Sequence, residues 1–308
     1  MNPNSAKDLK LGLIGLDTSH VLYFCDSFNN PQAIQPLPGA RIVAAWPGGS
    51  PDLHSSISRV PGYTADLRDK FGVRILDSIE AVASEVDAVL LTSLDGRVHR
   101  EQFARVAAAA PGRPVFVDKP FALSAADARA IFEIAARHHV PMFTSSSLRF
   151  TGAITRVVTP ETRATVCGAD FHGPAALEPT NPGFFWYGIH GIEMLYAAMG
   201  TGCERVHCTS INDYDLVTGV WRDGRIGTFR GNRTGNWEFH GLVHFEKQTA
   251  HVNVSTETKG FFTCLAEAIL EFARTRRVPI EPAETIEMIR FIEAANDSRD
   301  HGGRDVSL

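Results

Sequence analysis

An apolar run typical of a buried strand leads directly into an acid, a lysine and a proline at Val115-Phe116-Val117-Asp118-Lys119-Pro120. Proline cannot extend a ladder of strand hydrogen bonds, so the strand must end where Asp118 and Lys119 stand. In open α/β sheets, ligands bind beyond the carboxyl ends of the strands, which favours a functional role for Lys119. A solvated lysine at a strand end is the structural alternative, and the position alone does not decide between them.

A second candidate site is the turn Gly15-Leu16-Asp17-Thr18-Ser19-His20, which follows the first predicted strand. The dinucleotide fingerprint GxGxxG stands at such turns, because glycines let the backbone approach a pyrophosphate at a helix N-terminus. Gly15 matches the first glycine, whereas Asp17 and His20 replace the second and third. Asp17 suits a helix N-cap, and its carboxylate would then occupy the place of a phosphate.

The residues after the second predicted strand also depart from a dinucleotide site. An acid usually holds the ribose there, and this chain has Trp46-Pro47-Gly48-Gly49. Two outcomes fit these changes. Either the hydroxyls and amides of Thr18 and Ser19 take the phosphates in a shifted pose, or the site no longer takes a dinucleotide.

The elements that would position these residues alternate strand and helix as far as residue 145. Ser124 and Asp127 predict a box-like helix start, and the Pro/Gly/Ser-rich residues 47–61 predict a long surface loop. The alternation predicts a parallel sheet covered on both faces. Apolar spacing predicts strands at 10–16, 41–46, 88–92, 115–117 and 141–145, and helices at 18–28, 66–71, 98–110 and 125–138.

After Phe150 the pattern changes to strands with few helices between them, which predicts a mostly antiparallel sheet with helices on one face. Asp223-Gly224 predicts a hairpin turn, since this dipeptide favours positive φ. The predicted strands are 163–171, 206–211, 215–221, 227–231, 239–244 and 250–254, and the predicted helices are 188–199, 261–275 and 283–296.

Composition narrows the class of protein. A chain of 308 residues fits two domains, and a net charge of -5 without a Lys/Arg cluster argues against nucleic-acid and anionic-membrane partners. Residues 1–10 lack the apolar core of a signal peptide, and no apolar stretch is long enough to span a bilayer, so we expect a cytoplasmic protein. An odd number of cysteines without CxxC spacing predicts thiols that are mostly buried: Cys25, Cys167, Cys203, Cys208 and Cys264.

From about residue 9 to residue 308, the order and spacing of several motifs together resemble the Gfo/Idh/MocA oxidoreductase family, which includes glucose-fructose oxidoreductase and inositol dehydrogenase. Asp118-Lys119-Pro120 is similar to the family's Glu-Lys-Pro motif. The tail, residues 280–308, also matches. The other matching motifs are Gly12-Leu13-Ile14-Gly15, Leu94-Asp95-Gly96-Arg97-Val98-His99, Leu148-Arg149-Phe150 and Tyr187-Gly188-Ile189-His190-Gly191-Ile192-Glu193.

The resemblance implies an α/β fold: a Rossmann-type dinucleotide-binding domain at 1–150, and an α/β domain with a mostly antiparallel open sheet at 151–308. The second domain would bind substrate and form a homo-oligomer, because helices on one face of its sheet leave the other face to be covered. The implied activity is hydride transfer between NAD or NADP and a sugar, cyclitol or related hydroxy compound. The partner is therefore a small molecule.

The resemblance also implies roles for single residues. Lys119 would hold the substrate hydroxyl and tune proton transfer, and a neutral His190 would be the general acid or base. Trp186 stands where the family has an acid, and it could stack on a sugar ring or belong to the core. Arg149 would tie the two domains together. The cofactor residues would be Gly15, Asp17, Thr18, Ser19, Ser93, His99 near the nicotinamide edge, and Asp118; the substrate residues would be Arg149, Trp186, Tyr187 and Glu193.

Two other classes of protein compete with a dehydrogenase. One is a binding protein of the same fold that has lost its cofactor, which the changes at Asp17, Pro47 and Trp186 favour. Against it, Lys119 and His190 both remain. The other is a metal-dependent lyase or hydrolase, although its candidate ligands lack an HExxH-like spacing: Asp17, His20, His172, His190 and Glu193.

Overall fold

The computed structural model describes residues 8–308, so most of the segment on which the signal-peptide prediction rests lies outside it. The chain divides into two compact units. The first runs to Phe121 and adds Ala130–Thr144 and Phe262–Pro279, and the second comprises Ala122–Arg129, Ser145–Phe261 and Ile280–Leu308. The prediction divided the chain at residue 150, whereas the structure groups Phe262–Pro279 with the N-terminal unit.

Within the described residues, the first unit contains a six-stranded parallel sheet with the order β3-β2-β1-β4-β5-β6. The order reverses between β1 and β4, which is the topological switch point where doubly wound sheets bind ligands. The predicted parallel sheet is confirmed. Its strands are β1 (Leu9–Ile14), β2 (Ala40–Trp46), β3 (Arg74–Ile75), β4 (Ala88–Leu91), β5 (Val115–Val117) and β6 (Met142–Thr144).

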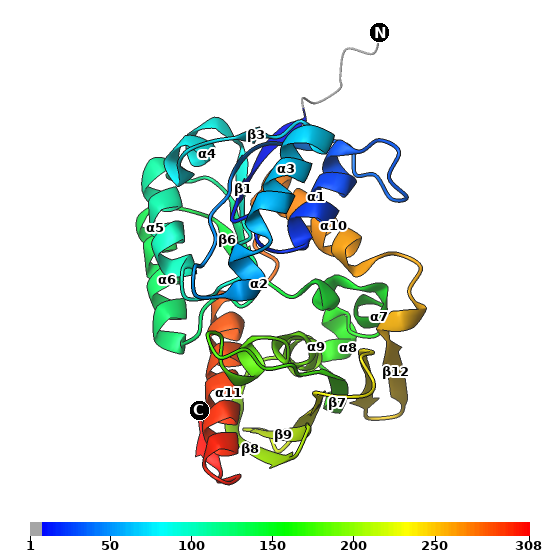
Figure 1. Cartoon of the computed structure of the whole chain (residues 1–308). Coiled ribbons are helices and arrows are strands. Elements are labelled where there is room, and N and C mark those ends of the chain that lie inside the picture. The colour runs from blue at the N-terminus through cyan, green and yellow to red at the C-terminus, as the bar shows by residue number, and fades with distance from the viewer. Residues whose placement is uncertain (1–7) are drawn as a thin grey trace. The chain divides into compact units, whose positions relative to one another are not determined.

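Helices cover both faces of this sheet, with α1 and α3 on one side and α4 and α5 on the other (Figure 1). Because both faces are covered, β4 and β5 are buried along their whole length and read as continuous apolar runs. Ser124 accepts a hydrogen bond from the Asp127 amide at 3.0 Å, which confirms the predicted cap. The helices are α1 (His20–Asn29), α2 (His54–Ile57), α3 (Val60–Phe71), α4 (Ile79–Glu85), α5 (His99–Ala109), α6 (Ala125–Arg137) and α10 (Phe261–Thr275).

Three features of this unit differ from the predictions. The predicted loop at residues 47–61 contains α2 and the start of α3, and the short elements β3 and α4 were not predicted. The helix α10 was expected on the C-terminal sheet, but it packs in the first unit, where Phe272 meets Phe143 of β6 with ring centroids 4.9 Å apart. Periodicity shows that a helix has an apolar face and not which sheet that face covers.

The second unit contains, within the described residues, a seven-stranded sheet with the order β12-β11-β7-β10-β9-β8-β13. Its pairs are antiparallel except β7 with β10, which confirms the mostly antiparallel prediction. Gly224 adopts φ +87 in the predicted hairpin between β9 and β10. The strands are β7 (Val166–Pro174), β8 (Cys203–Ile211), β9 (Tyr214–Trp221), β10 (Ile226–Asn232), β11 (His240–Phe245), β12 (Thr249–Asn253) and β13 (Val306–Ser307).

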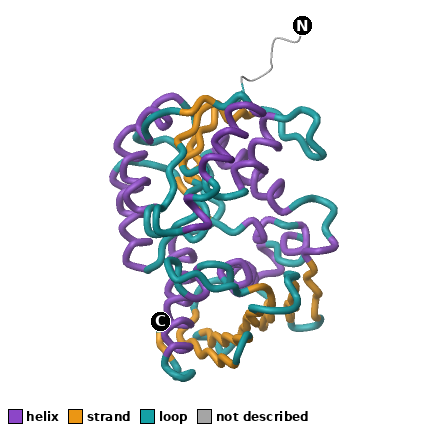
Figure 2. Tube along the Cα trace, in the orientation of Figure 1, coloured by secondary structure: helices purple, strands orange, loops and turns teal. Residues whose placement is uncertain are grey.

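The helices α9 and α11 pack against this sheet, α9 on β7 and β10 and α11 on β8 (Figures 1 and 2). Every residue of α9 is buried, so this helix forms the centre of the second core. No helix within residues 8–308 has both the length and the apolar character needed to cross a membrane. The helices of the unit are α7 (Gly152–Thr155), α8 (Pro160–Arg163), α9 (Ile189–Met199) and α11 (Pro282–Asp300), with 3-10 turns at Ser147–Phe150, Gly183–Phe185 and Val254–Thr256.

Candidate active site

The cofactor-side residues named above lie in the first unit, at the carboxyl ends of β1, β4 and β5. Gly15 follows β1 and adopts φ +90, a conformation that favours glycine. A Cβ at this position would lie 2.5 Å from the Ser93 amide nitrogen, so the glycine allows the turn after β1 to touch the segment after β4. Ser93 donates its own hydroxyl to Gln102 at 2.7 Å. The close contact that this glycine permits is with the protein itself, and its approach to a pyrophosphate stays a prediction.

Asp17 does not cap α1, so the prediction of an N-cap role is wrong. The helix begins at His20 with Ser19 in the N-cap position. The Asp17 carboxylate is buried, and it accepts hydrogen bonds from the Leu94 amide at 2.9 Å and from the Ser56 hydroxyl at 2.6 Å. Burial is the main cause of its raised pKa. Asp17 therefore joins three segments of the unit and does not occupy the helix N-terminus.

The N-terminus of α1 is compatible with a phosphate group. The Ser19 side chain makes no capping hydrogen bond to the helix, and it is only partly buried. Thr18 is buried, and its hydroxyl lies 3.4 Å from the His20 amide. Together with Gly15 at the switch point, these groups fit a dinucleotide whose pyrophosphate lies at the start of α1.

The loop after β2, where a dinucleotide site usually has an acid for the ribose, has a different arrangement here. The Gly15 and Leu16 amides donate to the carbonyls of Trp46 and Pro47 at 3.0 and 2.6 Å, so the loop after β2 runs beside the glycine turn. The same loop is linked to the segment after β4, because Arg97 donates to Asp52 at 2.8 Å and also pairs with Asp95. Sequence reasoning did not find this link, since Arg97 and Asp52 are 45 residues apart.

His99 is fully buried, and each of its ring nitrogens lies beside a backbone carbonyl. Its Nε2 lies 2.7 Å from the Ser93 carbonyl, and its Nδ1 lies 3.1 Å from the Phe121 carbonyl. Burial lowers its pKa, which favours the neutral ring. His99 thus connects the segments that follow β4 and β5.

Asp118 and Lys119 follow β5 and are both buried, with exposed fractions of 2% and 8%. Burial lowers the pKa of Lys119 and the Asp118 carboxylate partly offsets this effect, while Arg59 lowers it further. Burial alone would raise the pKa of Asp118, but the charges and hydrogen bonds of His20 and Lys119 outweigh it, and the pKa is lowered. The lysine is therefore a desolvated amine beside a carboxylate, which is an arrangement suited to proton transfer.

The remaining predicted site residues lie in the second unit, around the start of α9. His190 is buried, and its Nδ1 lies 2.6 Å from the Ser146 hydroxyl. The rings of Tyr187 and Phe239 meet the imidazole edge to face, with centroids 5.2 and 5.8 Å away. Trp186 and Tyr187 are half-buried. A histidine oriented by a hydroxyl has the geometry of a positioned general acid or base.

Arg149 and Glu193 form a buried ion pair at 2.9 Å, and Arg149 also pairs with Glu284. Burial lowers the pKa of Arg149, but the two carboxylates outweigh this and raise it. Burial raises the pKa of Glu193 in spite of Arg149. Both ion-pair partners belong to the same unit as Arg149, so these contacts stabilise the second unit and do not provide the predicted tie between domains.

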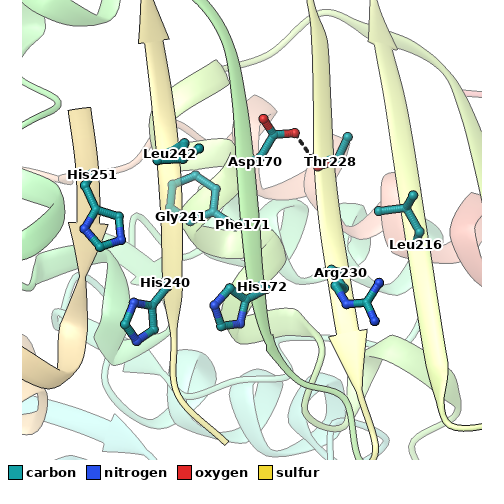
Figure 3. Close-up of a pocket in the computed structure, with 10 residues that line it drawn as sticks. All are labelled: Asp170, Phe171, His172, Leu216, Thr228, Arg230, His240, Gly241, Leu242 and His251. Carbon is teal, nitrogen blue, oxygen red and sulfur yellow. Dashed lines mark hydrogen bonds between the residues drawn. The ribbon is translucent and has the colours of Figure 1, made fainter. Parts of the chain in front are cut away.

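The second unit also has an open pocket of about 480 Å³ on the face of its sheet that α9 does not cover (Figure 3). His172 and His240 stack there with ring centroids 5.1 Å apart. Burial, followed by the charge of His240, lowers the pKa of His172. Within residues 8–308, no set of three His, Cys, Asp or Glu side chains is arranged to hold a metal ion. The proposed metal ligands therefore do not form one site.

Comparison with known proteins agrees with this architecture. Residues 34–146 match the model of a family described as "Oxidoreductase family, NAD-binding Rossmann fold", GFO_IDH_MocA. This segment of the chain is therefore similar to that oxidoreductase family. An inositol 2-dehydrogenase of Klebsiella pneumoniae (strain 342) is 33% identical over 129 residues, which are 41% of this chain and 32% of that protein. The match thus spans about a third of the curated relative.

Solved structures of the same fold cover nearly the whole chain. A scyllo-inositol dehydrogenase from Lactobacillus casei, with bound NAD(H) and scyllo-inositol, has a TM-score of 0.79 at 14% identity, covering 98% of this chain and 99% of that one. A myo-inositol 2-dehydrogenase from Lactobacillus plantarum has a TM-score of 0.76 at 15% identity, covering 98% and 100%. At these identities the likeness establishes the α/β fold.

Proposed function

We propose that this chain belongs to the matched oxidoreductase family and is an NAD-dependent oxidoreductase that moves a hydride between the nicotinamide and a CH–OH carbon of a cyclitol, sugar or related compound. The observation that carries the proposal is the buried Asp118 and Lys119 pair at the carboxyl edge of a sheet with Rossmann strand order. The family description and the inositol dehydrogenase relatives support the same chemistry.

The dinucleotide would be held at the turn after β1, where Gly15 gives close approach and Thr18 and Ser19 offer hydroxyls and amides. Bound NAD would supply the hydride acceptor. The inward orientation of Asp17 supports this assignment, because both of its carboxylate oxygens already have protein donors. The family description favours NAD over NADP, and titration with both cofactors tests this choice.

Lys119 and His190 would divide the work on the substrate oxygen. Lys119 would hold the hydroxyl, since an ammonium donates hydrogen bonds, and His190 would exchange the proton that leaves when the hydroxyl becomes a carbonyl. Ser146 would orient the His190 ring for this exchange. Trp186 and Tyr187 are proposed to contact the apolar face of the ring, together with Arg149 and Glu193 on the substrate side.

The test is nicotinamide reduction by the full chain with a panel of inositol stereoisomers and aldoses. We expect turnover with at least one ring alcohol, and loss of turnover in Lys119→Met with NAD affinity within a few-fold of wild type. Lys70→Met is the matched control, because Lys70 is an exposed lysine of the same unit. Turnover near wild type in Lys119→Met would remove this lysine from the mechanism.

A binding protein that has lost its cofactor is the second candidate, and the loop after β2 favours it. Trp46 and Pro47 bring carbonyls, and no carboxylate, to the place where a ribose is usually held. A Cβ on Gly48 would lie 3.3 Å from the Gly15 Cα, which shows how closely this loop covers the turn. In that case the purified protein would bind a ring alcohol without binding NAD.

We also propose that a second copy of the chain covers the outer face of the seven-stranded sheet. This face exposes Leu216 and Leu242, and it carries charges of both signs in Asp170 and Arg230 (Figure 3). Mixed charges around apolar residues suit a self-complementary interface. Sedimentation should show an oligomer that Leu242→Asp dissociates, and a monomeric wild type at micromolar concentration would contradict the proposal.

The cytoplasmic location is likewise proposed, and fractionation of cells that express the chain would test it.

A further inference from the structure

His20 occupies the place of the third fingerprint glycine, and the structure gives it a partner that the sequence does not suggest. It is the first residue of α1, yet its Nδ1 bonds the Oδ2 of Asp118, 98 residues away. Asp118 follows β5, two strands across the sheet from β1. The His20 side chain therefore extends along the carboxyl edge of the sheet toward Lys119.

Both oxygens of the Asp118 carboxylate have partners, one in the His20 ring and the other in the backbone of Lys119. The Oδ2 atom contacts the His20 ring, and the Oδ1 atom accepts the Lys119 backbone amide at 2.8 Å. All three side chains are at least nine-tenths buried. Water therefore screens the charges weakly, and a proton on His20 strongly affects how far Asp118 stabilises the Lys119 ammonium.

Aromatic rings hold His20 in this position. Phe262 of α10 lies 4.5 Å from the imidazole centroid, and Phe24, one turn further along α1, lies 6.4 Å away and meets it edge to face. These contacts exclude water from the ring and leave it few alternative rotamers. Phe24 of α1 and Phe262 of α10 thus hold the His20 ring against Asp118, which follows β5.

We propose that His20 is a positioning residue for Lys119: it orients the Asp118 carboxylate and competes with the lysine for its charge. The other charged groups that act on this cluster are Arg59, which disfavours the lysine ammonium, and His99, on which the Asp118 charge acts. A carboxylate paired with a neutral His20 stabilises the ammonium more than one paired with an imidazolium. The His20 contact with Asp118 therefore affects how readily Lys119 gives up a proton.

This inference rests on the proposed function only where it concerns turnover, so the first measurement is independent of activity. The full chain would be labelled with ¹⁵N,¹³C-lysine, and the Lys119 signal would be titrated in wild type and in His20→Asn. Asparagine keeps a donor toward Asp118 but cannot carry a charge. The other lysines, Lys7, Lys10, Lys70, Lys247 and Lys259, serve as internal references, and Lys119→Arg assigns the signal.

We expect the Lys119 titration in His20→Asn to move by about one pH unit, because the hydrogen-bond partner of the Asp118 carboxylate changes. His54→Asn, at an exposed histidine of the same unit, should leave it unchanged. An unchanged Lys119 titration in a folded His20→Asn protein would overturn the proposal. His20→Gln, with a longer donor side chain, provides the same comparison if the asparagine variant does not fold.

The second measurement is the pH profile of nicotinamide reduction. The limb that reports Lys119 should move in the same direction in His20→Asn, whereas a purely structural effect would lower the rate at every pH. An active enzyme with a shifted lysine titration and an unshifted profile would also overturn the proposal. If wild type shows no turnover, the proposed function fails, and the lysine titration still decides whether His20 and Lys119 are coupled.

Discussion

Replacing Asp17 by alanine tests the unexpected geometry of the glycine turn. The substitution removes the acceptor of two donors, the Leu94 amide at 2.9 Å and the Ser56 hydroxyl at 2.6 Å. A buried donor left without a partner costs about 1–3 kcal/mol. Because the Ser56 hydroxyl can rotate, we expect Asp17→Ala to lower the free energy of unfolding of the first unit by about 2–4 kcal/mol.

Asp17→Asn is the matched variant, since its amide group offers an acceptor to Leu94 and its nitrogen can donate to the Ser56 oxygen. Its cost should stay below about 1 kcal/mol. Burial raises the pKa of Asp17 above its ordinary value of 3.8, so the native state retains a proton that the unfolded state has lost. Wild-type stability therefore falls as the pH rises from 3.8 to the folded pKa, and above it the penalty is complete. Because asparagine does not titrate, the free energy of unfolding of Asp17→Asn should rise relative to that of wild type as the pH increases.

Hydrogen exchange in increasing urea, read by mass spectrometry on peptides from β1 and α1, measures the first unit separately from the second. Protection of these peptides should fall in Asp17→Ala and remain close to wild type in Asp17→Asn. Loss of less than about 0.5 kcal/mol in Asp17→Ala would refute the reasoning, because a change that small is typical of an exposed surface site. A helix-capping role would instead lower protection in α1 alone.

Further variants test other parts of the account. Gly15→Ala should lose NAD binding and stability, because its Cβ would lie 2.5 Å from a backbone nitrogen. Gly62→Ala, in α3 with open space around the new Cβ, should raise the free energy of unfolding by about 0.5–1 kcal/mol. Calorimetry measures the NAD affinity of both variants, and thermal melting measures their stability. Ser146→Ala removes the hydroxyl beside His190 Nδ1 and should lower kcat about tenfold, which is about 1.4 kcal/mol, with the KM for NAD unchanged in steady-state assays. Arg149→Met leaves the buried Glu193 without its ion-pair partner, while Glu284 keeps Arg163, and should destabilise the second unit by about 3–5 kcal/mol in urea unfolding. An unaltered midpoint would show that these ion pairs contribute little.

The sequence predicted the elements on which the candidate site is built, because long apolar runs and turn residues are local signals. The strand before Asp118, the cap at Ser124 and the hairpin at Asp223-Gly224 all formed as expected. The placement of α10 was not predictable, because its apolar face would suit either sheet. Short elements such as β3 carry too few residues to show a period.

The contacts that decide the chemistry were harder to predict, because they join residues far apart in the chain. Asp17 has a local role as a cap and a tertiary role as an acceptor, and only the fold shows that the tertiary role prevails. His20 and Asp118 are separated by 98 residues, and no spacing links them. The only signal in the sequence was that His20 stands in place of a fingerprint glycine, and this does not indicate which residue it contacts.

Calorimetric titration of NADH into the purified chain, with Asp17→Asn as the paired variant, tests whether the turn after β1 binds a dinucleotide. We expect one binding site per chain, with similar affinity in both proteins, because the Asp17 carboxylate faces Leu94 and Ser56 and not the pyrophosphate. Absence of binding in wild type, or binding gained only when the charge at Asp17 is removed, would contradict it. The fold would then hold a closed cofactor site.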